Sequence, residues 1–260
     1  MIKDSLLWKI SPPQSEIASY LFGTMHVKDE IAYKHVNKVI AALCKCDKLM
    51  CEIDLDRAQT EIDPNAYKIS EGSLSTLIKP KKYLKYRKVI LKSYGFDIDD
   101  MEEYFPIVIF NKIAESLLSN DRGFPLDTFL WNKAKELKLS TDGIENLQQH
   151  VDILQQLDIE TQLKMLKSAV RNTSKFKKSL KKITQLYADQ KIIKLYKSTK
   201  SSMGSFRHIL IYNRNEIMAE RISDNRHEPC MYAVGAAHLA GNRGILNLLK
   251  KKNYKLTAVY

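Results

Sequence analysis

The chain has 260 residues, of which 44% are hydrophobic and 28% are charged, and its formal net charge is +12. This length and composition are those of a folded globular protein whose core needs no disulfides, and they exclude a disordered chain. The excess of positive charge raises nucleic acid or an anionic surface as possible classes of partner.

The first residues hold no long apolar run and no small-residue cleavage site, so no signal peptide is predicted. No segment reaches the ~20 apolar residues of a membrane-spanning helix. The chain as given therefore looks cytoplasmic, although removal of an export signal would leave the same pattern; compartment and oligomeric state stay open. The four cysteines lack CxxC or zinc-site spacing and are expected to be reduced thiols.

The N-terminal part of the sequence predicts a strand, a helix and a second strand. The stretch "SYLFGTMHV" reads as a buried strand that ends at Gly23 and is followed by His26. Apolar residues at helical spacing over 31–43 predict a helix, and the apolar run at 49–55 predicts a strand that contains Glu52.

The middle of the chain, about 61–224, is expected to be a mainly helical insertion. Periodicity and glycine or proline punctuation predict helices over 81–92, 106–118, 126–137, 146–157, 160–170, 175–199 and 206–222. A short strand is predicted at 139–142. No stretch reads as a flexible linker, so one domain is expected over 1–260, with its sheet core in 1–60 and 225–260.

Two segments of this insertion are strongly basic. Residues 171–200 hold ten Lys or Arg and one acid, and "KPKKYLKYRKVILK" at 79–92 is similar. Apolar residues recur at helical spacing in both, so the lysines are interpreted as the solvated faces of amphipathic helices. Binding of nucleic acid is less favoured, because no recognisable nucleic-acid module accompanies the charge.

The C-terminal part of the sequence repeats the order found at the N-terminus. "CMYAVGAAH" predicts a strand that leads through Gly235 to His238, and a helix and a last strand, "YKLTAVY", follow. The predicted fold is therefore α/β, a small central sheet built from two related strand, Gly-x-x-His, helix, strand halves. Strands joined through a helix should be parallel, which would bring both imidazoles to one cleft at the carboxyl edge of the sheet.

These positions suggest chemistry, although each has an ordinary structural reading. A lone histidine is more often a hydrogen-bonding residue than a ligand, but His26 and His238 occupy matching settings and could bind a divalent metal or shuttle protons. Glu52 is either a solvent-facing acid or a metal ligand or general base at the same edge. The other four histidines, His35, His150, His208 and His227, have no matching partner and are expected to be structural or at the surface.

Three further charged residues are weaker candidates. Arg214 would be a surface arginine by itself, but its helix precedes the second histidine strand and a guanidinium is the usual partner of a carboxylate or oxyanion. Glu145 and Asp127 lie at predicted helix starts, where an acid is stabilised by the helix dipole alone.

Several segments together resemble one family. They are "LLWKI", "SYLFGTMHV", "CEIDLD", "GFPLDTFLWNKAKELKLSTDGIENLQQHVDIL", "YNRNEIMAERI" and "YAVGAAHLAGNRGILNLLKKKNYKL". In this order they resemble the TraB/GumN family, which is similar to the TIKI-type metalloproteases and belongs with the erythromycin-esterase/ChaN-like superfamily.

This resemblance implies an active cleft between the two Gly-x-x-His motifs. It maps the family's histidines onto His26 and His238, its glutamate onto Glu52 and its arginine onto Arg214, and it suggests Glu145 as a further acid. Gly23, Gly235 and Asp127 are expected to line the cleft. Where the second motif usually reads Gly-x-Gly-His, this chain has Ala237.

The leading functional hypothesis is a hydrolase, a metal-dependent peptidase acting on a peptide or a small molecule. His26, His238 and Glu52 would hold Mn²⁺, Co²⁺ or Zn²⁺, Glu52 or Glu145 would act as base, and Arg214 would stabilise the oxyanion. A metal-independent, esterase-like hydrolase is the second reading. The third is a non-catalytic protein that binds a peptide or a haem, and a nucleic-acid binder ranks last.

Overall fold

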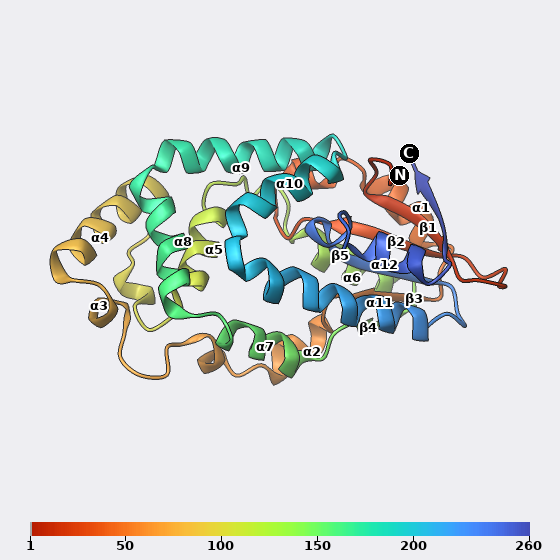
Figure 1. Ribbon diagram of the computed structural model, residues 1–260, viewed down its shortest axis with the longest axis horizontal. Helices are drawn as coiled ribbons and strands as arrows, with labels where there is room; N and C mark the ends of the chain where they lie inside the picture. The colour runs from red at the N-terminus through yellow and green to blue at the C-terminus, as the bar shows by residue number, and fades with distance from the viewer. Residues whose placement is uncertain (1) are drawn as a thin grey trace. The chain divides into compact units, whose positions relative to one another are not determined.

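The computed structural model describes residues 2–260, apart from the side chains of residues 154, 155, 200–203 and 205. The chain forms two compact units (Figure 1). Unit 1 consists of Met1–Glu61, Asn120–His150 and Ile183–Tyr260, and unit 2 of Ile62–Ser119 and Val151–Lys182. Unit 1 contains the sheet, and unit 2 is helical. One domain over 1–260 stays a prediction.

Unit 1 is built on a mixed sheet of six strands. They are β1 (Leu7–Ser11), β2 (Ser19–Thr24), β3 (Lys48–Cys51), β4 (Ser140–Gly143), β5 (Cys230–Gly235) and β6 (Lys255–Val259). Their order is β4-β3-β5-β2-β1-β6; β4, β3, β5 and β2 are mutually parallel, and β1 is antiparallel to both β2 and β6. The predicted α/β class is confirmed, with strands from both chain ends and a long helical stretch between them.

The strands of the two predicted halves alternate in the sheet. β5 lies between β2 and β3, so the strands of the first half run in the same direction without pairing. As a result, the two strands that precede the Gly-x-x-His histidines are direct neighbours, with Thr24 opposite Gly235. β1 was not predicted, because its short apolar run is interrupted by Lys9 and followed by two prolines.

The predicted strand at 49–55 is wrong at its C-terminal end. β3 ends at Cys51, and α2 (Leu55–Glu61) begins four residues later. The side chain of Asp54 accepts a hydrogen bond from the backbone N–H of Arg57 at 2.9 Å, which caps the new helix. Glu52 is therefore the first residue beyond the strand.

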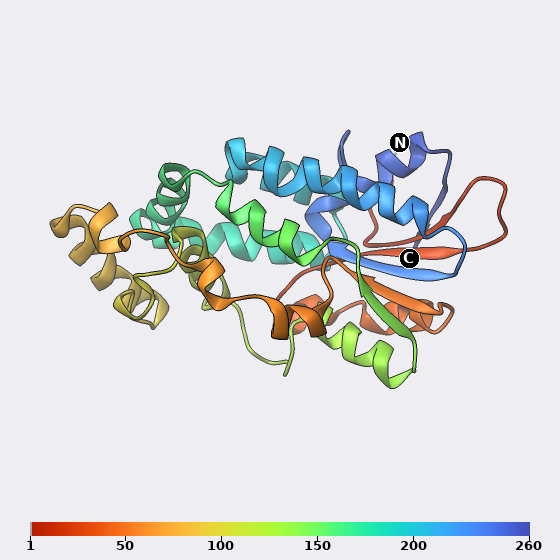
Figure 2. The ribbon, with the colours of Figure 1, turned by 90° about the horizontal axis from the view of Figure 1, so that it is seen from below.

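Helices cover both faces of this sheet (Figure 2). Two of them, α1 (Val36–Leu43) and α6 (Leu126–Glu136), pack against the four parallel strands from one side, and α11 (Arg214–Asp224) and α12 (Ile245–Lys251) lie on the other. The core between them includes Leu21, Leu130 and Leu246, which are fully buried. The remaining elements of unit 1 are η1 (Glu30–Tyr33), α10 (Ile192–Met203), η4 (Gly204–Phe206), the π-helix η5 (His208–Asn213) and η6 (Ala236–His238).

Unit 2 has a core of its own, formed by Leu74, Ile90, Ile109 and Leu166 and their neighbours. Its elements are η2 (Pro64–Tyr67), α3 (Leu74–Leu77), α4 (Pro80–Tyr94), η3 (Asp99–Met101), α5 (Pro106–Glu115) and α8 (Ile159–Arg171). Two more helices, α7 (Leu147–Gln155) and α9 (Thr173–Ala188), contain residues of both units.

The helix predicted over 175–199 is two helices. Gln190 adopts a left-handed conformation with φ of 56°, which ends α9 and allows α10 to begin at Ile192. The helix predicted over 206–222 begins as the π-helix η5 and continues as α11. None of the described helices is both long and apolar enough to span a membrane.

Replacement of Leu130 by alanine should destabilise unit 1. Leu130 is fully buried under the sheet, so Leu130→Ala should lower the free energy of unfolding by about 2–5 kcal/mol. Leu137→Ala at the end of the same helix, where the side chain is 37% exposed, is the matched control and should cost much less. Urea unfolding of both variants measures the difference, and equal losses would contradict this packing.

Candidate functional site

Four side chains follow the carboxyl ends of four neighbouring parallel strands. Glu145 follows β4, Glu52 follows β3, His238 follows β5 and His26 follows β2. Because parallel strands end at the same edge of a sheet, these residues belong to one edge, which is where α/β proteins build their sites. That both imidazoles face one shared cleft stays a prediction.

Arg214 joins the two glutamates. It is the first residue of α11 and is buried, with 8% of its surface exposed. Its Nε donates to both carboxylate oxygens of Glu145 at 3.0 Å, and its Nη2 contacts Glu145 Oε2 and Glu52 Oε2. One guanidinium therefore binds two carboxylates through the planar, bidentate geometry that arginine alone provides.

The backbone brings the two glutamates together. The N–H groups of Ile144 and Glu145 donate to the carbonyls of Cys51 and Glu52 at 2.8 and 2.7 Å, which extends the β3–β4 ladder past both strand ends. A Cβ at Gly143 would lie 2.5 Å from the backbone nitrogen of Asp54, so only glycine allows this close approach.

His238 is held in one tautomer by the residue next to Arg214. The Asn215 amide donates from Nδ2 to the carbonyl of Arg243 at 2.6 Å, so its Oδ1 faces His238 Nδ1, also at 2.6 Å. An amide oxygen only accepts, so His238 Nδ1 carries the proton and Nε2 is unprotonated. That nitrogen lies 3.7 Å from Glu52 Oε1.

The loop after β5 also binds Glu52. The N–H of Gly235 donates to Glu52 Oε1 at 2.6 Å, and a Cβ at position 235 would lie 3.1 Å from this oxygen. Gly23 has a different role: it is buried in β2, and a Cβ there would meet the side chain of Leu239 at 2.6 Å. Gly23 therefore allows the turn that carries His238 to pack against β2.

His26 is oriented by Asp127. Its Nδ1 donates to Asp127 Oδ2 at 2.7 Å, so Nε2 is the unprotonated nitrogen when the ring is neutral; 67% of the imidazole side chain is exposed. The charges of Asp127 and Glu52 both act on the thiol of Cys51, so the His26–Asp127 pair lies near the end of β3. Among the described residues, the buried Oδ1 of Asp127 has no hydrogen-bond partner.

The two glutamates bind protons with different affinity. Burial alone would raise the pKa of Glu52, but the charges of Arg214 and His238 and the N–H of Gly235 hold it well below its usual range. Burial raises the pKa of Glu145 above its usual range, because the loss of water outweighs the pull of Arg214. Environments that separate the pKa values of two neighbouring acids are typical of sites with acid–base chemistry.

The pKa values of His238 and Arg214 are shifted in opposite directions. Burial lowers the pKa of His238 to about 4, and the charge of Arg214 adds to this effect while Glu52 opposes it. Burial also works against the charge of Arg214, but the two carboxylates raise its pKa, so it stays a cation. At neutral pH the cluster is thus an ionised Arg214 and Glu52 beside a neutral imidazole.

The residue chemistry of this edge fits a divalent cation. A metal-binding histidine normally donates its other ring N–H to an oxygen, as His26 and His238 both do. Glu52 is ionised and adjacent to His238 Nε2, and Asp127 Oδ1 is a buried acceptor without a partner in the described chain. In residues 2–260 as described, however, no three His, Cys, Asp or Glu side chains are already clustered as a metal site.

Two residues near the cluster were not predicted. Asn215 is fully buried and fixes His238, and its only signal in the sequence is its position beside Arg214. His150, which was expected to be structural or at the surface, lies close enough for Arg214 and Glu52 to act on its pKa, which burial lowers. Its buried Nδ1 has no hydrogen-bond partner among the described residues.

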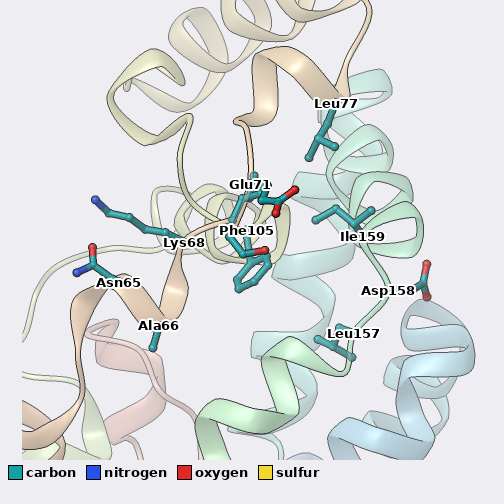
Figure 3. A pocket seen from close by; sticks show the side chains of 11 residues that line it. Asn65, Ala66, Lys68, Glu71, Leu77, Phe105, Leu157, Asp158 and Ile159 are labelled. Carbon is teal, nitrogen blue, oxygen red and sulfur yellow. The ribbon is translucent and has the colours of Figure 1, made fainter.

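Unit 2 contains a cavity of about 820 Å³ (Figure 3). Leu77, Phe105, Leu157 and Ile159 form much of its apolar lining, with Lys68, Glu71 and Asp158 as charged members. No residue that the sequence proposed for chemistry lines this cavity.

The sequence is similar to known proteins over nearly its whole length. A model of the TraB/PrgY/gumN family matches residues 6–258. "Metalloprotease TIKI1" and "Metalloprotease TIKI2" of Danio rerio are 22% and 23% identical over 97% of this chain, and "Metalloprotease TIKI homolog" of Amphimedon queenslandica is 22% identical over 98%. The chain covers 63%, 60% and 61% of these proteins, less than two thirds of their length. No solved structure gives a significant match.

Arg214 is the cation that Glu52 and Glu145 share. Its replacement should reverse the way in which the free energy of unfolding depends on pH. In the wild type, the lowered pKa of Glu52 adds stability above its unfolded pKa of about 4.3, and this stability is lost as the pH falls. In Arg214→Met, the carboxylates of Glu52 and Glu145 lose their guanidinium partner, so their pKa values rise and the variant should gain stability as the pH falls from about 7 to about 5.

Urea unfolding at both pH values measures this effect. At about pH 7, Arg214→Met should lose about 3–5 kcal/mol. Arg57→Met, which removes the exposed partner of Glu61, is the matched control and should change little. A loss in Arg214→Met no greater than in the control would show that the cluster is not buried and paired as described.

The imidazole of His238 should stay neutral down to about pH 4. Because its folded pKa is depressed, the unfolded chain binds the extra proton below about 6.5, and stability should fall as the pH drops through this window. An NMR titration of the histidine ring signals, with His238→Gln to assign the resonance, measures this pKa directly. A midpoint near 6.5 would contradict the burial of the ring.

Proposed function

Because the chain belongs to the TraB/PrgY/gumN family, we propose that it is a hydrolase and that it cleaves peptide bonds in a metal-dependent manner. The observation that carries this proposal is the Glu52–Arg214–Glu145 cluster beside the neutral imidazole of His238, at the carboxyl edge of four parallel strands. The relatives named metalloproteases support the choice of a peptide bond.

His26, His238 and Glu52 are the proposed ligands of a divalent ion such as Mn²⁺, Co²⁺ or Zn²⁺. The tautomers that Asp127 and Asn215 impose present both Nε2 atoms as electron-pair donors, and the lowered pKa of Glu52 keeps it ionised. When bound, such an ion polarises the scissile carbonyl and lowers the pKa of a water molecule.

Glu52 and Glu145 have different proposed roles. The Glu52 side chain is 24% exposed, whereas that of Glu145 is 1% exposed, so Glu52 is the acid that can meet substrate and water. We assign to Glu52 the transfer of the proton from the attacking water to the leaving amine. Its lowered pKa makes it a weak base, so this transfer requires a water that is already activated.

Arg214 and Glu145 support Glu52. Arg214 keeps Glu52 ionised and in place, and its fixed positive charge favours the negative charge that develops on the carbonyl oxygen. Glu145 binds Arg214 from its buried side and is a positioning residue. Asn215 has the same role toward His238.

A metal-independent hydrolase is the second candidate, because one observation favours it. The exposed imidazole of His26 is hydrogen-bonded to a carboxylate at 2.7 Å, which is the arrangement of a general base and its orienting acid. In this version His26 takes the proton of the attacking water, and Asp127 stabilises the imidazolium that results.

Chelation and substitution separate the two candidates. The metal-dependent version predicts that peptide cleavage is lost on dialysis against a chelator and returns with Mn²⁺, Co²⁺ or Zn²⁺. Glu52→Gln should lower kcat/KM by about 100-fold or more, and His238→Ala should also abolish retention of the metal. His227→Ala, an exposed histidine, is the matched control.

The outcomes are distinct. Cleavage that survives the chelator and His238→Ala but not His26→Ala would replace the first version by the second. Protein that retains metal but cleaves neither peptides nor esters would contradict hydrolysis.

A further inference from the structure

The outer side of α4 in unit 2 carries exposed apolar side chains among lysines. Leu84 is 61% exposed and Leu91 is 51% exposed, and they are two of the few large hydrophobic side chains left exposed in the described chain. They are seven residues apart, which is two helical turns, so they lie on the same side of the helix. Within unit 2, α4 lies at the edge of the group of helices (Figures 1 and 2).

The lysines of α4 extend this surface. Lys81 and Lys88 are exposed and lie three or four residues from the two leucines, which makes them neighbours on the helix. Lys85 and Lys92 are also exposed, and among the described residues none of the four is within ion-pair distance of an acid. We call Leu84, Leu91 and these four lysines the α4 face.

The opposite side of α4 packs into the core of unit 2. Tyr83, Tyr86, Ile90 and Tyr94 are buried in the core of unit 2. The exposed leucines are therefore not needed to hold the helix in place, and the helix is amphipathic in an unusual way: its solvent side combines cations with apolar side chains.

Further positive charge lies in the helices of unit 2 that pack against the buried side of α4. Residues 161–182, in α8 and the first part of α9, hold eight Lys or Arg and no acid. Tyr94, at the end of α4, donates to the carbonyl of Ala169 in α8 at 2.8 Å, and Lys177 Nζ lies 5.8 Å from the centre of its ring. These contacts place the two basic segments side by side within unit 2.

We propose that the α4 face docks unit 2 onto the surface of an anionic lipid bilayer. The phosphate and carboxylate groups of such a surface attract lysines, and the acyl boundary below them accepts leucine side chains, so one helix lying in the interface satisfies both. The proposal concerns peripheral binding by residues of unit 2 and is independent of the hydrolytic activity assigned to unit 1.

Two other partners fit this surface less well. Single-stranded nucleic acid binds through lysines combined with exposed aromatic rings, but Tyr83, Tyr86 and Tyr94 of α4 are buried. A second copy of the chain would bring two lysine-rich faces together, and like charges repel. An anionic bilayer complements both the charge and the exposed leucines.

Vesicle co-sedimentation of the full chain tests the proposal. Vesicles of phosphatidylcholine alone are compared with vesicles that also contain phosphatidylserine. The wild type should bind only the anionic vesicles. Lys81→Gln with Lys88→Gln should weaken binding by more than about tenfold, and Leu84→Ser with Leu91→Ser should weaken it to a similar extent.

The matched control changes the net charge by the same amount as the α4 lysine variant, but in another part of the chain. Lys250→Gln with Lys251→Gln removes two exposed lysines from α12 of unit 1 and should leave binding within about twofold of the wild type. All of the substituted side chains are exposed, so far-UV circular dichroism should show unchanged folding.

Three results would overturn the proposal. They are equal binding to both kinds of vesicle or to neither, equal binding by the wild type and the leucine variant, and an equal loss in the α12 control. A dimer in analytical ultracentrifugation that is lost in the leucine variant would assign the α4 face to a second copy instead. Peptide cleavage by the α4 variants should equal that of the wild type, so failure here leaves the hydrolase proposal unaffected.

Discussion

The structure depends on one buried guanidinium that binds two carboxylates. Arg214 connects α11 to the ends of β3 and β4, which are remote from it in sequence, and it lies where desolvation of charge is costly. Such a cluster is stable only when each charge keeps its partner, because a buried carboxylate alone costs several kcal/mol. The same constraint makes the two glutamates unequal: one is an ionised group near the surface, and the other is a buried group with a raised pKa.

The strand order explains how residues from both chain ends reach this point. β5 inserts between β2 and β3, so the strand ends that carry His26, His238 and Glu52 are neighbours in space. Short contacts complete the arrangement: Gly235 binds Glu52 through its N–H, Gly143 allows the close approach of two backbones, and Asn215 fixes His238. Each of these contacts acts on the position or the protonation of a group that could meet substrate.

Much of the fold and of the candidate site could be predicted from the sequence, because several of their residues leave a local pattern in it. Buried strands such as β2 and β5 are nearly continuous apolar runs that end at a glycine, and the histidines follow at a fixed distance. Glu52 is conspicuous because an acid next to such a run is rare. In contrast, β1 has a short and interrupted apolar pattern, and the alternation of the two halves in the sheet results from long-range pairing that leaves no local trace. Asn215 was missed because a buried amide on a charged helix looks like any surface residue until its partner is known.

The central claim is that His26 and His238 serve one cation-binding edge of the sheet. Titration with substoichiometric Mn²⁺ tests it most directly, because a paramagnetic ion broadens the NMR signals of the nuclei around it. The account predicts that the ring signals of His26 and His238 broaden together while those of the exposed His227 stay sharp. If only one of the two rings broadens, or neither does, the two histidines do not share a site.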